Sequence, residues 1–302
     1  MHSMHIGDIA FLGFVMNSSG VLEFFGDGYP YHRYLPWSLA DWSNSTFVAK
    51  TTTLMPREGF MPMAEDGVTP REFVPRCIIV KPWGGHVLNA VGLSGPGAPA
   101  LVAVGKWQAR IEPFVISFMA VGKERNDRMQ EWLGFLSVIA GACKDFHSRF
   151  AIEINVSCPN VGLDQAELAD EIEQMLDIGE RLGVPLIVNV NLLFPPKLAA
   201  SISRHKNCAA VSQSNSVPWG AFPERIPWKR LFGSMTSPLE KRGFAAGGYS
   251  GPYALPILLN WIRDARYAYE GKRWLIAGGG IQSPDDAEVV MRTGFPILHG
   301  IK

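Results

Sequence analysis

The sequence predicts an α/β protein in which eight buried strands alternate with helices. Two observations predict this class: short apolar runs rich in β-branched residues recur along the chain, and amphipathic segments separate them. Continuous apolar runs are typical of parallel strands that are covered on both faces. The eight predicted strands lie near residues 13–16, 47–49, 114–119, 152–156, 186–190, 209–212, 274–277 and 297–299.

Five helices are expected between these strands. They lie near residues 126–146, 164–182, 196–205, 252–269 and 284–292. The clearest is 164–182, because its apolar residues fall on one stripe of a helical wheel. Gly183 suits the position just after its end, and Pro185 then opens the next strand.

Eight strands that alternate with helices are typical of either a closed barrel or a doubly wound sheet. No Gly-x-Gly-x-x-Gly follows the first strand, which disfavours a dinucleotide-binding Rossmann domain. No Pro/Ser-rich linker divides the chain, so one domain spanning residues 1–302 is expected. The stretch 51–110 is expected to hold loops and a small hairpin, inserted after the second strand.

Composition excludes several classes of function. Hydrophobic residues make up 47% and charged residues 19% of the 302 residues, so the chain can bury a sizeable core. The 28 basic and 28 acidic residues balance, and we expect no basic surface for nucleic acid. The seven histidines show no metal-ligand spacing, so no metal site is expected.

The cysteines and the N-terminal segment indicate the cellular compartment. The four cysteines are far apart in sequence, a pattern that suits a reducing cytosol. The N-terminal segment lacks a basic region before its short apolar run and indicates a strand, not a signal peptide. No stretch reaches the ~18 apolar residues that cross a bilayer. We therefore expect a cytoplasmic protein without a membrane partner.

The loop after the fourth strand carries the most informative residues. In the segment 153–160 the strand ends and runs into a loop that holds Asn155, Ser157, Cys158 and Asn160. In a barrel, the carboxyl ends of the strands carry the active site. Amides beside a thiol offer donors and acceptors for a planar heterocycle, and a thiol poised toward thiolate can serve as a base. The same pattern also fits an ordinary turn with an inert, buried cysteine.

Two glycine-rich loops suggest a phosphate site. They are residues 247–251 and 279–281, and Pro252 stands where a helix is expected to begin. Glycine lets backbone N–H groups approach a phosphate closely, and a helix N-terminus favours an anion. Two such loops after the last strands of a barrel form a recurrent phosphate site. Either loop alone could equally be an ordinary turn.

The segment Asn155-Val-Ser-Cys-Pro-Asn160 resembles the signature of the dihydroorotate dehydrogenases. In that family this loop carries the base that removes a proton from C5 of dihydroorotate. Soluble members use cysteine and membrane-associated members use serine, so Cys158 resembles the soluble class. The resemblance implies a (β/α)₈ TIM barrel, an FMN cofactor and a role in pyrimidine biosynthesis.

Further segments extend the resemblance, in the family's order, over about residues 13–300. Ser18-Ser-Gly20 resembles the loop that passes under the flavin, and residues 49–59 resemble the family's Thr-Lys-Thr-x-Thr-x-x-Pro-Arg-x-Gly segment. Residues 89–93 resemble the loop that binds the orotate carboxylate. Asn215-Ser216 resembles the pair that binds the edge of the pyrimidine ring, and the two glycine loops resemble those that hold the FMN phosphate.

The resemblance implies a set of site residues. Cys158 and Lys50 are implied as catalytic, with Lys50 between flavin and substrate. The implied substrate-binding residues are Asn89, Val91, Gly92, Leu93, Asn155, Asn160, Asn215 and Ser216. The implied FMN-binding residues are Ser19, Gly20, Lys50, Thr51, Ser117, Asn155, Asn189, Ser216, Ser250, Gly251, Gly279, Gly280 and Gly300.

The implied reaction joins proton and hydride transfer. The Cys158 thiolate takes the C5 proton of dihydroorotate and the C6 hydride passes to flavin N5. The soluble classes then reoxidise FMN either with fumarate directly or with NAD through an iron–sulfur partner subunit, and the sequence leaves both acceptors open. A homodimer is also expected.

The sequence departs from the family's pattern at several positions. Asn189 stands where the family usually has a lysine near flavin N1, and Ser117 stands where many members have asparagine. Gly95 replaces an asparagine in the substrate loop region. The sequence given ends at Lys302, so the family's final helix is expected to be missing.

Two alternative functions remain open. One is another FMN barrel enzyme, such as a dihydropyrimidine dehydrogenase-like reductase, although Asn160 favours orotate recognition. The other is a flavin-binding pseudoenzyme, which the loss of the lysine charge at Asn189 would suit.

Overall fold

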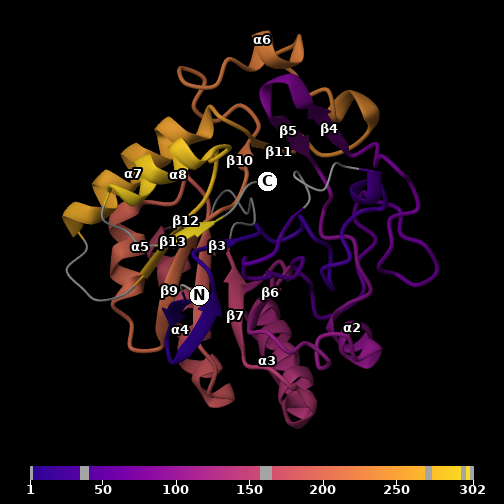
Figure 1. Ribbon diagram of the computed structural model, residues 1–302, viewed down its shortest axis with the longest axis vertical. Coiled ribbons are helices and arrows are strands. Elements are labelled where there is room, and N and C mark those ends of the chain that lie inside the picture. The colour runs from indigo at the N-terminus through magenta and orange to yellow at the C-terminus, as the bar shows by residue number, and fades with distance from the viewer. Residues whose placement is uncertain (1–2, 35–40, 157–164, 269–273, 294–296, 300–302) are drawn as a thin grey trace.

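The computed structural model describes residues 3–34, 41–156, 165–268, 274–293 and 297–299 (Figure 1). Its centre is a seven-stranded parallel sheet. In spatial order the strands are β3 (Val15–Met16), β13 (Ile297–His299), β12 (Trp274–Ala277), β9 (Cys208–Gln213), β8 (Leu186–Val190), β7 (Phe150–Asn155) and β6 (Phe114–Phe118).

The sheet closes on itself through one further segment. Parallel bridges pair Met16 with Thr46, and Val48 with Val115, so residues 46–52 lie between the two edge strands β3 and β6. The seven strands and this segment form an eight-membered parallel ring. The predicted barrel is therefore confirmed, and each of its eight members coincides with a predicted strand.

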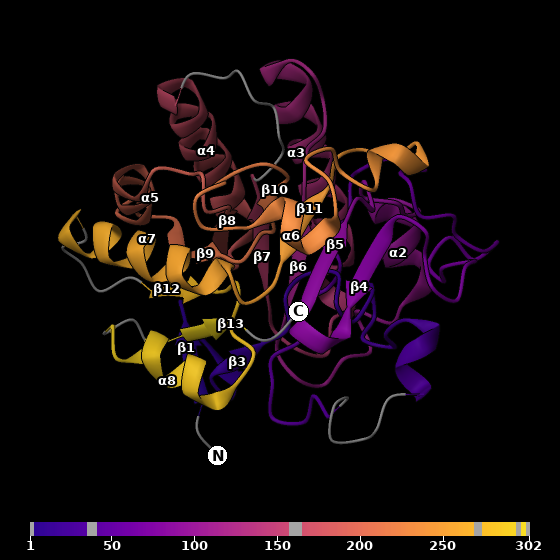
Figure 2. The ribbon, with the colours of Figure 1, turned by 90° about the horizontal axis from the view of Figure 1, so that it is seen from above.

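Helices cover the outside of the ring, as Figure 2 shows from above. They are α2 (Ala98–Val104), α3 (Arg125–Ala142), α4 (Gln165–Gly179), α5 (Pro196–Ser203), α7 (Ala254–Ala268) and α8 (Pro284–Met291). A further short helix, α6 (Trp228–Phe232), lies apart from the ring, at the top of Figure 1. Short 3₁₀ helices occupy Pro30–Tyr34, Pro82–Gly84, Cys143–Asp145, Glu180–Leu182 and Glu240–Arg242. The five predicted helices are confirmed, whereas α2 and α6 were not predicted. No helix in the described part of the chain is long and apolar enough to cross a membrane.

Successive residues of each barrel strand face opposite sides. The outward set, for example Phe118 and Ile152, packs against helix residues such as Trp132 and Ile172 in the main core. The inward set near the amino ends of the strands is apolar and forms a second, smaller core. Its strand members are Val48, Val115, Ala151, Ile187, Ala210 and Ile276.

An N-terminal hairpin closes the amino end of the barrel. Strands β1 (Ser3–Ile6) and β2 (Ile9–Leu12) are antiparallel and turn at Gly7, whose φ of 59° lies in the left-handed region that glycine adopts readily. The hairpin packs Ile6, Ile9 and Phe11 against the inward apolar layer. This segment was predicted as one strand. That prediction was wrong because the two-residue turn splits it into two.

A four-stranded antiparallel sheet stands apart from the ring. It consists of β10 (Val217–Pro218), β11 (Gly248–Ser250), β5 (His86–Asn89) and β4 (Ile78–Lys81), in that order. Figure 1 shows it beyond the carboxyl ends of β6 and β7, opposite the N-terminal hairpin. The hairpin predicted after the second strand is confirmed as β4 and β5. The sheet thus brings residues from three distant parts of the chain to the barrel mouth.

Candidate active site

The barrel interior changes from apolar to polar between two successive layers. Two residues beyond the apolar layer, the same strands carry Lys50, Ser117, Glu153, Asn189 and Ser212. All five are at least 96% buried. Buried polar groups need partners, so the layer marks the carboxyl half of the barrel as a place where polar contacts are made.

A chain of hydrogen bonds runs through this polar layer. Asn215 donates from Nδ2 to Oδ1 of Asn155 at 3.1 Å, and Asn155 donates from Nδ2 to Oγ1 of Thr51 at 3.2 Å. The hydroxyls of Thr51 and Ser117 are 2.9 Å apart, and Ser117 donates to Oε1 of Glu153 at 2.7 Å. The chain holds both asparagine amides in fixed orientations at the ends of β7 and β9.

Asn189 lies beside this chain with half of its amide unpaired. Its strand β8 pairs with β7, and the two asparagines Asn155 and Asn189 are register partners. Oδ1 of Asn189 accepts a hydrogen bond from Ser214 at 3.1 Å, whereas Nδ2 is buried without a partner in the described part of the chain. An orphaned buried donor is costly and is expected to meet a ligand acceptor.

Lys50 is paired with an acid that the sequence analysis did not single out. Its Nζ lies 3.3 Å from Oε2 of Glu23, and both side chains are at least 93% buried. Nζ also lies 4.7 Å from the centroid of the Phe24 ring. Burial lowers the pKa of Lys50 and raises that of Glu23, while their mutual attraction opposes both shifts.

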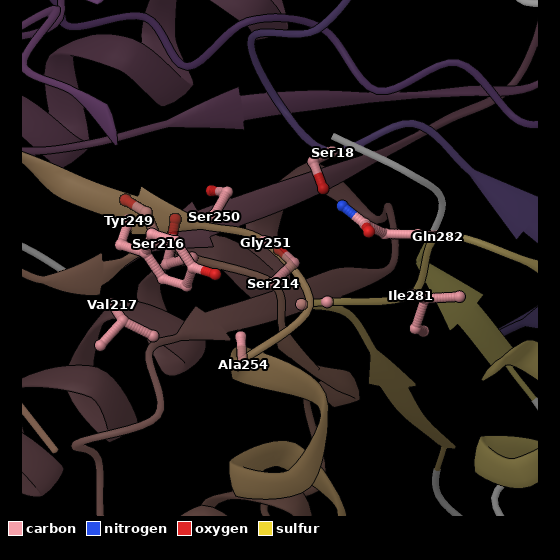
Figure 3. Close-up of a pocket in the computed structure, with 13 residues that line it drawn as sticks. Ser18, Ser214, Ser216, Val217, Tyr249, Ser250, Gly251, Ala254, Ile281 and Gln282 are labelled. Atoms are coloured by element: carbon pink, nitrogen blue, oxygen red, sulfur yellow. The ribbon is translucent and has the colours of Figure 1, made fainter. Parts of the chain in front are cut away.

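The two glycine loops meet in one pocket, drawn in Figure 3. The residues that line it are Ser18, Ser214, Asn215, Ser216, Val217, Tyr249, Ser250, Gly251, Ala254, Gly279, Gly280, Ile281 and Gln282. A Cβ added to Gly280 would come 2.4 Å from the backbone nitrogen of Leu255, so only glycine lets this loop approach the first turn of α7. The hydroxyl of Ser250 is buried without a partner in the described structure. These described lining residues are uncharged, so the pocket offers neutral donors to an anion.

Side-chain donors hold the predicted substrate loop in place through backbone carbonyls. Asn89 ends β5 and donates from Nδ2 to the carbonyl of Gly248 at 3.3 Å. Arg57 donates from Nε to the carbonyl of Gly92 at 2.9 Å. Leu93 has a φ of 62°, in the left-handed region that a residue with a Cβ rarely adopts. Backbone strain of this kind is typical of loops that bind a ligand.

The structure gathers most of the predicted site residues into neighbouring groups. Lys50, Thr51, Ser117, Asn155, Asn189 and Asn215 belong to the polar layer and its chain, and Ser216, Ser250, Gly251, Gly279 and Gly280 line the glycine pocket. Ser19 and Gly20 lie in the loop after β3, next to the pocket residue Ser18. Cys158, Asn160 and Gly300 lie outside the described residues.

Several residues that shape the site were not predicted. They are Asn17, Glu23, Glu153, Ser212, Ser214 and Gln282. Asn17 is fully buried and exchanges two hydrogen bonds with the backbone of Val48, which fixes the first loop to the second barrel segment. The strand alternation could have indicated Glu153 and Ser212. The others depend on contacts between distant segments, which leave no local pattern.

The fold and the pocket together define a class of protein. A closed parallel barrel with a polar carboxyl end, and with two glycine loops beside a helix N-terminus, is typical of barrel enzymes that bind a phosphorylated cofactor.

Comparison with known proteins identifies the family. A family model described as Dihydroorotate dehydrogenase matches residues 2–299, and the chain belongs to this family. The chain is 28% identical over 285 residues to the catalytic subunit of dihydroorotate dehydrogenase B (NAD(+)) from Desulforudis audaxviator, covering 90% of this chain and 76% of the relative. It is 26% identical over 290 residues to the corresponding subunit from Thermodesulfovibrio yellowstonii, covering 93% and 80%.

Solved structures agree on the fold. The crystal structure of dihydroorotate dehydrogenase from Eimeria tenella in complex with ferulenol superposes with a TM-score of 0.67 at 15% identity, covering 99% of this chain and 78% of that chain. The ligand-free enzyme from the same organism gives a TM-score of 0.61. The predicted family, the oxidoreductase class and the FMN cofactor are thereby confirmed.

The described residues fit FMN. A terminal phosphate suits the glycine pocket, where the Ser250 hydroxyl lacks a protein partner. The pyrimidine edge of a flavin carries acceptors that suit the buried, unpaired Nδ2 of Asn189. Two unpaired buried donors, one in the polar layer and one in the glycine pocket, match the two polar parts of a single FMN molecule.

Proposed function

We propose that this protein oxidises dihydroorotate to orotate with the residues of the barrel mouth, acting as a single FMN-binding domain. The observation that carries the proposal is the hydrogen-bonded chain from Asn215 through Asn155 to Thr51. It presents two fixed amides: Asn215 lines the glycine pocket, and Asn155 is bonded to Thr51, which follows Lys50 directly. Amides with set donor and acceptor directions suit the edge of a planar pyrimidine.

Each group has a proposed part in the reaction. Asn89, Val91, Gly92 and Leu93 bind the substrate carboxylate together with Asn160, while Asn155, Asn215 and Ser216 bind the ring. Cys158 removes the proton from C5. Bound FMN supplies a two-electron acceptor for the hydride from C6. Lys50 places a cation between cofactor and substrate, where it offsets negative charge.

The electron acceptor belongs to the proposal as well. Relatives named as catalytic subunits of an NAD(+) enzyme favour NAD, reached through an iron–sulfur partner subunit, over fumarate. We propose that the reaction takes place in the cytoplasm and that the catalytic chain is a homodimer. Co-purification of a flavin and iron–sulfur protein with the tagged chain, followed by NAD reduction, tests the partner. Turnover of the isolated chain with fumarate would contradict it.

One experiment tests the activity. The flavin absorption of the purified protein is recorded anaerobically before and after addition of dihydroorotate, with dihydrouracil as the matched control. We expect bleaching with dihydroorotate alone. Bleaching with dihydrouracil instead would indicate a dihydropyrimidine reductase. A flavin that neither compound reduces, although dithionite does, would indicate a flavin-binding protein without this activity.

A further inference from the structure

Glu23 occupies a position that both its backbone and its charge disfavour. It lies in the loop after β3 with a φ of 56°, in the left-handed region that favours glycine. Only 5% of the residue is exposed, and burial of a carboxylate is unfavourable unless it has a partner. A residue held against both preferences points to a specific interaction.

The interaction is with Lys50, at both the side chain and the backbone. Oε2 of Glu23 lies 3.3 Å from Nζ of Lys50. The backbone N–H of Lys50 also donates to the carbonyl of Glu23 at 2.9 Å. Because Nζ lies 4.7 Å from the centre of the Phe24 ring as well, the ammonium is held between a carboxylate and a ring face.

The pair connects two parts of the proposed site. A Cβ added to Gly95 would lie 2.6 Å from Cζ of Phe24, so the Phe24 ring packs against the backbone just after the substrate loop. On the other side, Lys50 is followed directly by Thr51, which joins the hydrogen-bond chain to Asn155. Lys50 is therefore linked to both parts: its ammonium lies over the Phe24 ring, and its backbone leads directly into Thr51 of the amide chain.

We propose that Glu23 is a positioning residue, which holds the Lys50 ammonium in place at the barrel mouth and keeps it protonated. The proposal rests on the function proposed above, in which Lys50 faces cofactor and substrate. In this arrangement the wild-type pair brings little net charge to the site. Without the Glu23 carboxylate, Lys50 would be an unpaired buried cation that gives up its proton at a lower pH.

The other titratable groups around the pair stay neutral near neutral pH. In the described part of the chain they include Tyr29 and Tyr31 beside Glu23, Cys77 beside Lys50, and His32, whose ring contacts both tyrosines and whose pKa burial lowers. Burial raises the pKa of Tyr31 to about 12 and that of Cys77 to about 11, and it raises the pKa of Tyr29 well above its ordinary value. Between about pH 6 and pH 9, below the ordinary lysine pKa of ~10.4, the difference between Glu23→Gln and the double variant therefore reports on the pair, because Cys158 and His32 titrate alike in both.

The test measures the midpoint potential of bound FMN against pH in wild type, Glu23→Gln, Lys50→Gln and the double variant. Chemical reductant is used, so the result does not depend on dihydroorotate. We expect Glu23→Gln to raise the potential at acidic pH, where an uncompensated Lys50 cation stabilises reduced flavin, and to lose this gain as pH rises. The double variant should show neither effect. Asp27→Asn, which removes an exposed carboxylate from the same loop, should leave the potential unchanged.

A shift that persists in the Lys50→Gln background would overturn the proposal, as would a Glu23→Gln profile equal to that of wild type. A second measurement needs no flavin: NMR titration of ¹³C-labelled lysine, with the Lys50 signal assigned by Lys50→Gln. The Lys50 pKa should be lower in Glu23→Gln than in wild type, and equal values would refute the idea. If Glu23→Gln does not fold, Glu23→Asp suits the left-handed backbone and should shift the Lys50 pKa less but in the same direction; no shift would contradict the proposal.

Discussion

Asn189 accepts a hydrogen bond from Ser214 through Oδ1 at 3.1 Å and keeps its Nδ2 buried and unpaired in the described part of the chain. The amide is therefore oriented by one partner and has a donor left over. In the family that this sequence resembles, a lysine usually stands at this position. The neutral amide can still donate a hydrogen bond to a flavin, but it brings no charge.

The first prediction follows from this missing charge. At ~4 Å and an effective dielectric of ~20, a cation stabilises a reduced, anionic flavin by about 4 kcal/mol before desolvation, or on the order of 1–3 kcal/mol net. Since ~1.4 kcal/mol corresponds to ~30 mV for a two-electron couple, Asn189→Lys should raise the flavin potential by a few tens of millivolts. It should also speed reduction by dihydroorotate.

An anaerobic redox titration of both forms measures this shift. Asn191→Lys is the matched control, because it adds the same charge on the same segment, two residues beyond and outside the fully buried layer. Its potential should stay close to that of wild type. An equal or lower potential in Asn189→Lys would mean that another cation already compensates the missing lysine.

A second prediction concerns the cofactor and the glycine pocket. The purified protein should carry FMN, not FAD, without a covalent bond, and mass analysis of the released flavin identifies it. Gly280→Ala should weaken FMN binding by roughly tenfold or more, or about 1.4 kcal/mol. The reason is that its Cβ would lie 2.4 Å from the Leu255 nitrogen and its φ is 78°.

Quenching of free FMN fluorescence measures the affinity. Gly141→Ala serves as the control, because a Cβ there meets nothing within 4 Å on helix α3. It should leave the affinity unchanged and stabilise the fold by about 0.5–1 kcal/mol. Normal FMN binding by Gly280→Ala would show that the FMN phosphate does not bind in this pocket.

The third prediction concerns Cys158, which lies outside the described residues. Cys158→Ala should slow dihydroorotate-driven flavin reduction by ~10²–10⁴-fold or more, the usual share of base catalysis, and largely spare orotate binding. In wild type the rate should rise with pH as the thiol, with a reference pKa near ~8.5, becomes the thiolate. Stopped-flow bleaching measures both. In the control Cys143→Ala, at the far end of α3, dihydroorotate should reduce the flavin at the wild-type rate. An unchanged rate of flavin reduction in Cys158→Ala would exclude Cys158 as the base.

A fourth prediction concerns the N-terminal hairpin. Phe11 is fully buried against the inward apolar layer of the barrel. Phe11→Ala should lower the free energy of unfolding by about 3–5 kcal/mol, because it leaves a cavity in a packed core. Denaturant unfolding measures the loss. Phe14→Ala, at a residue that is 38% exposed, should cost much less, and equal losses would contradict the structural role of the hairpin.

Much of the fold could be predicted from local pattern. The barrel strands are continuous apolar runs, and a parallel strand buried on both faces requires such a run. The N-terminal hairpin was missed as a hairpin, although Gly7 and Asp8 form a two-residue turn between the register partners Ile6 and Ile9. Helix α6 was missed because its five residues are too few for a helical period to emerge.

The site residues, too, could be predicted where they stand in a local motif and not where they depend on tertiary contacts. Asn155, Asn215 and the glycine loops stand in recognisable segments, and the structure places them together. Glu23 could not be predicted, because a single acidic residue in a loop is normally expected to face solvent. Only the folded structure shows that its carboxylate lies 3.3 Å from the Lys50 ammonium. Ion pairs between distant segments depend on tertiary geometry, and the local sequence carries no trace of the partner.

The hairpin at the amino end of the barrel also has a consequence for biosynthesis. Its apolar residues, such as Ile6 and Phe11, leave the ribosome well before Ala210 and Ile276, against which they pack. Until those strands have left the ribosome, the hairpin has no complete surface to cover, and contacts this remote in sequence form slowly. Newly made chains should therefore depend on chaperones that shield exposed apolar segments during translation.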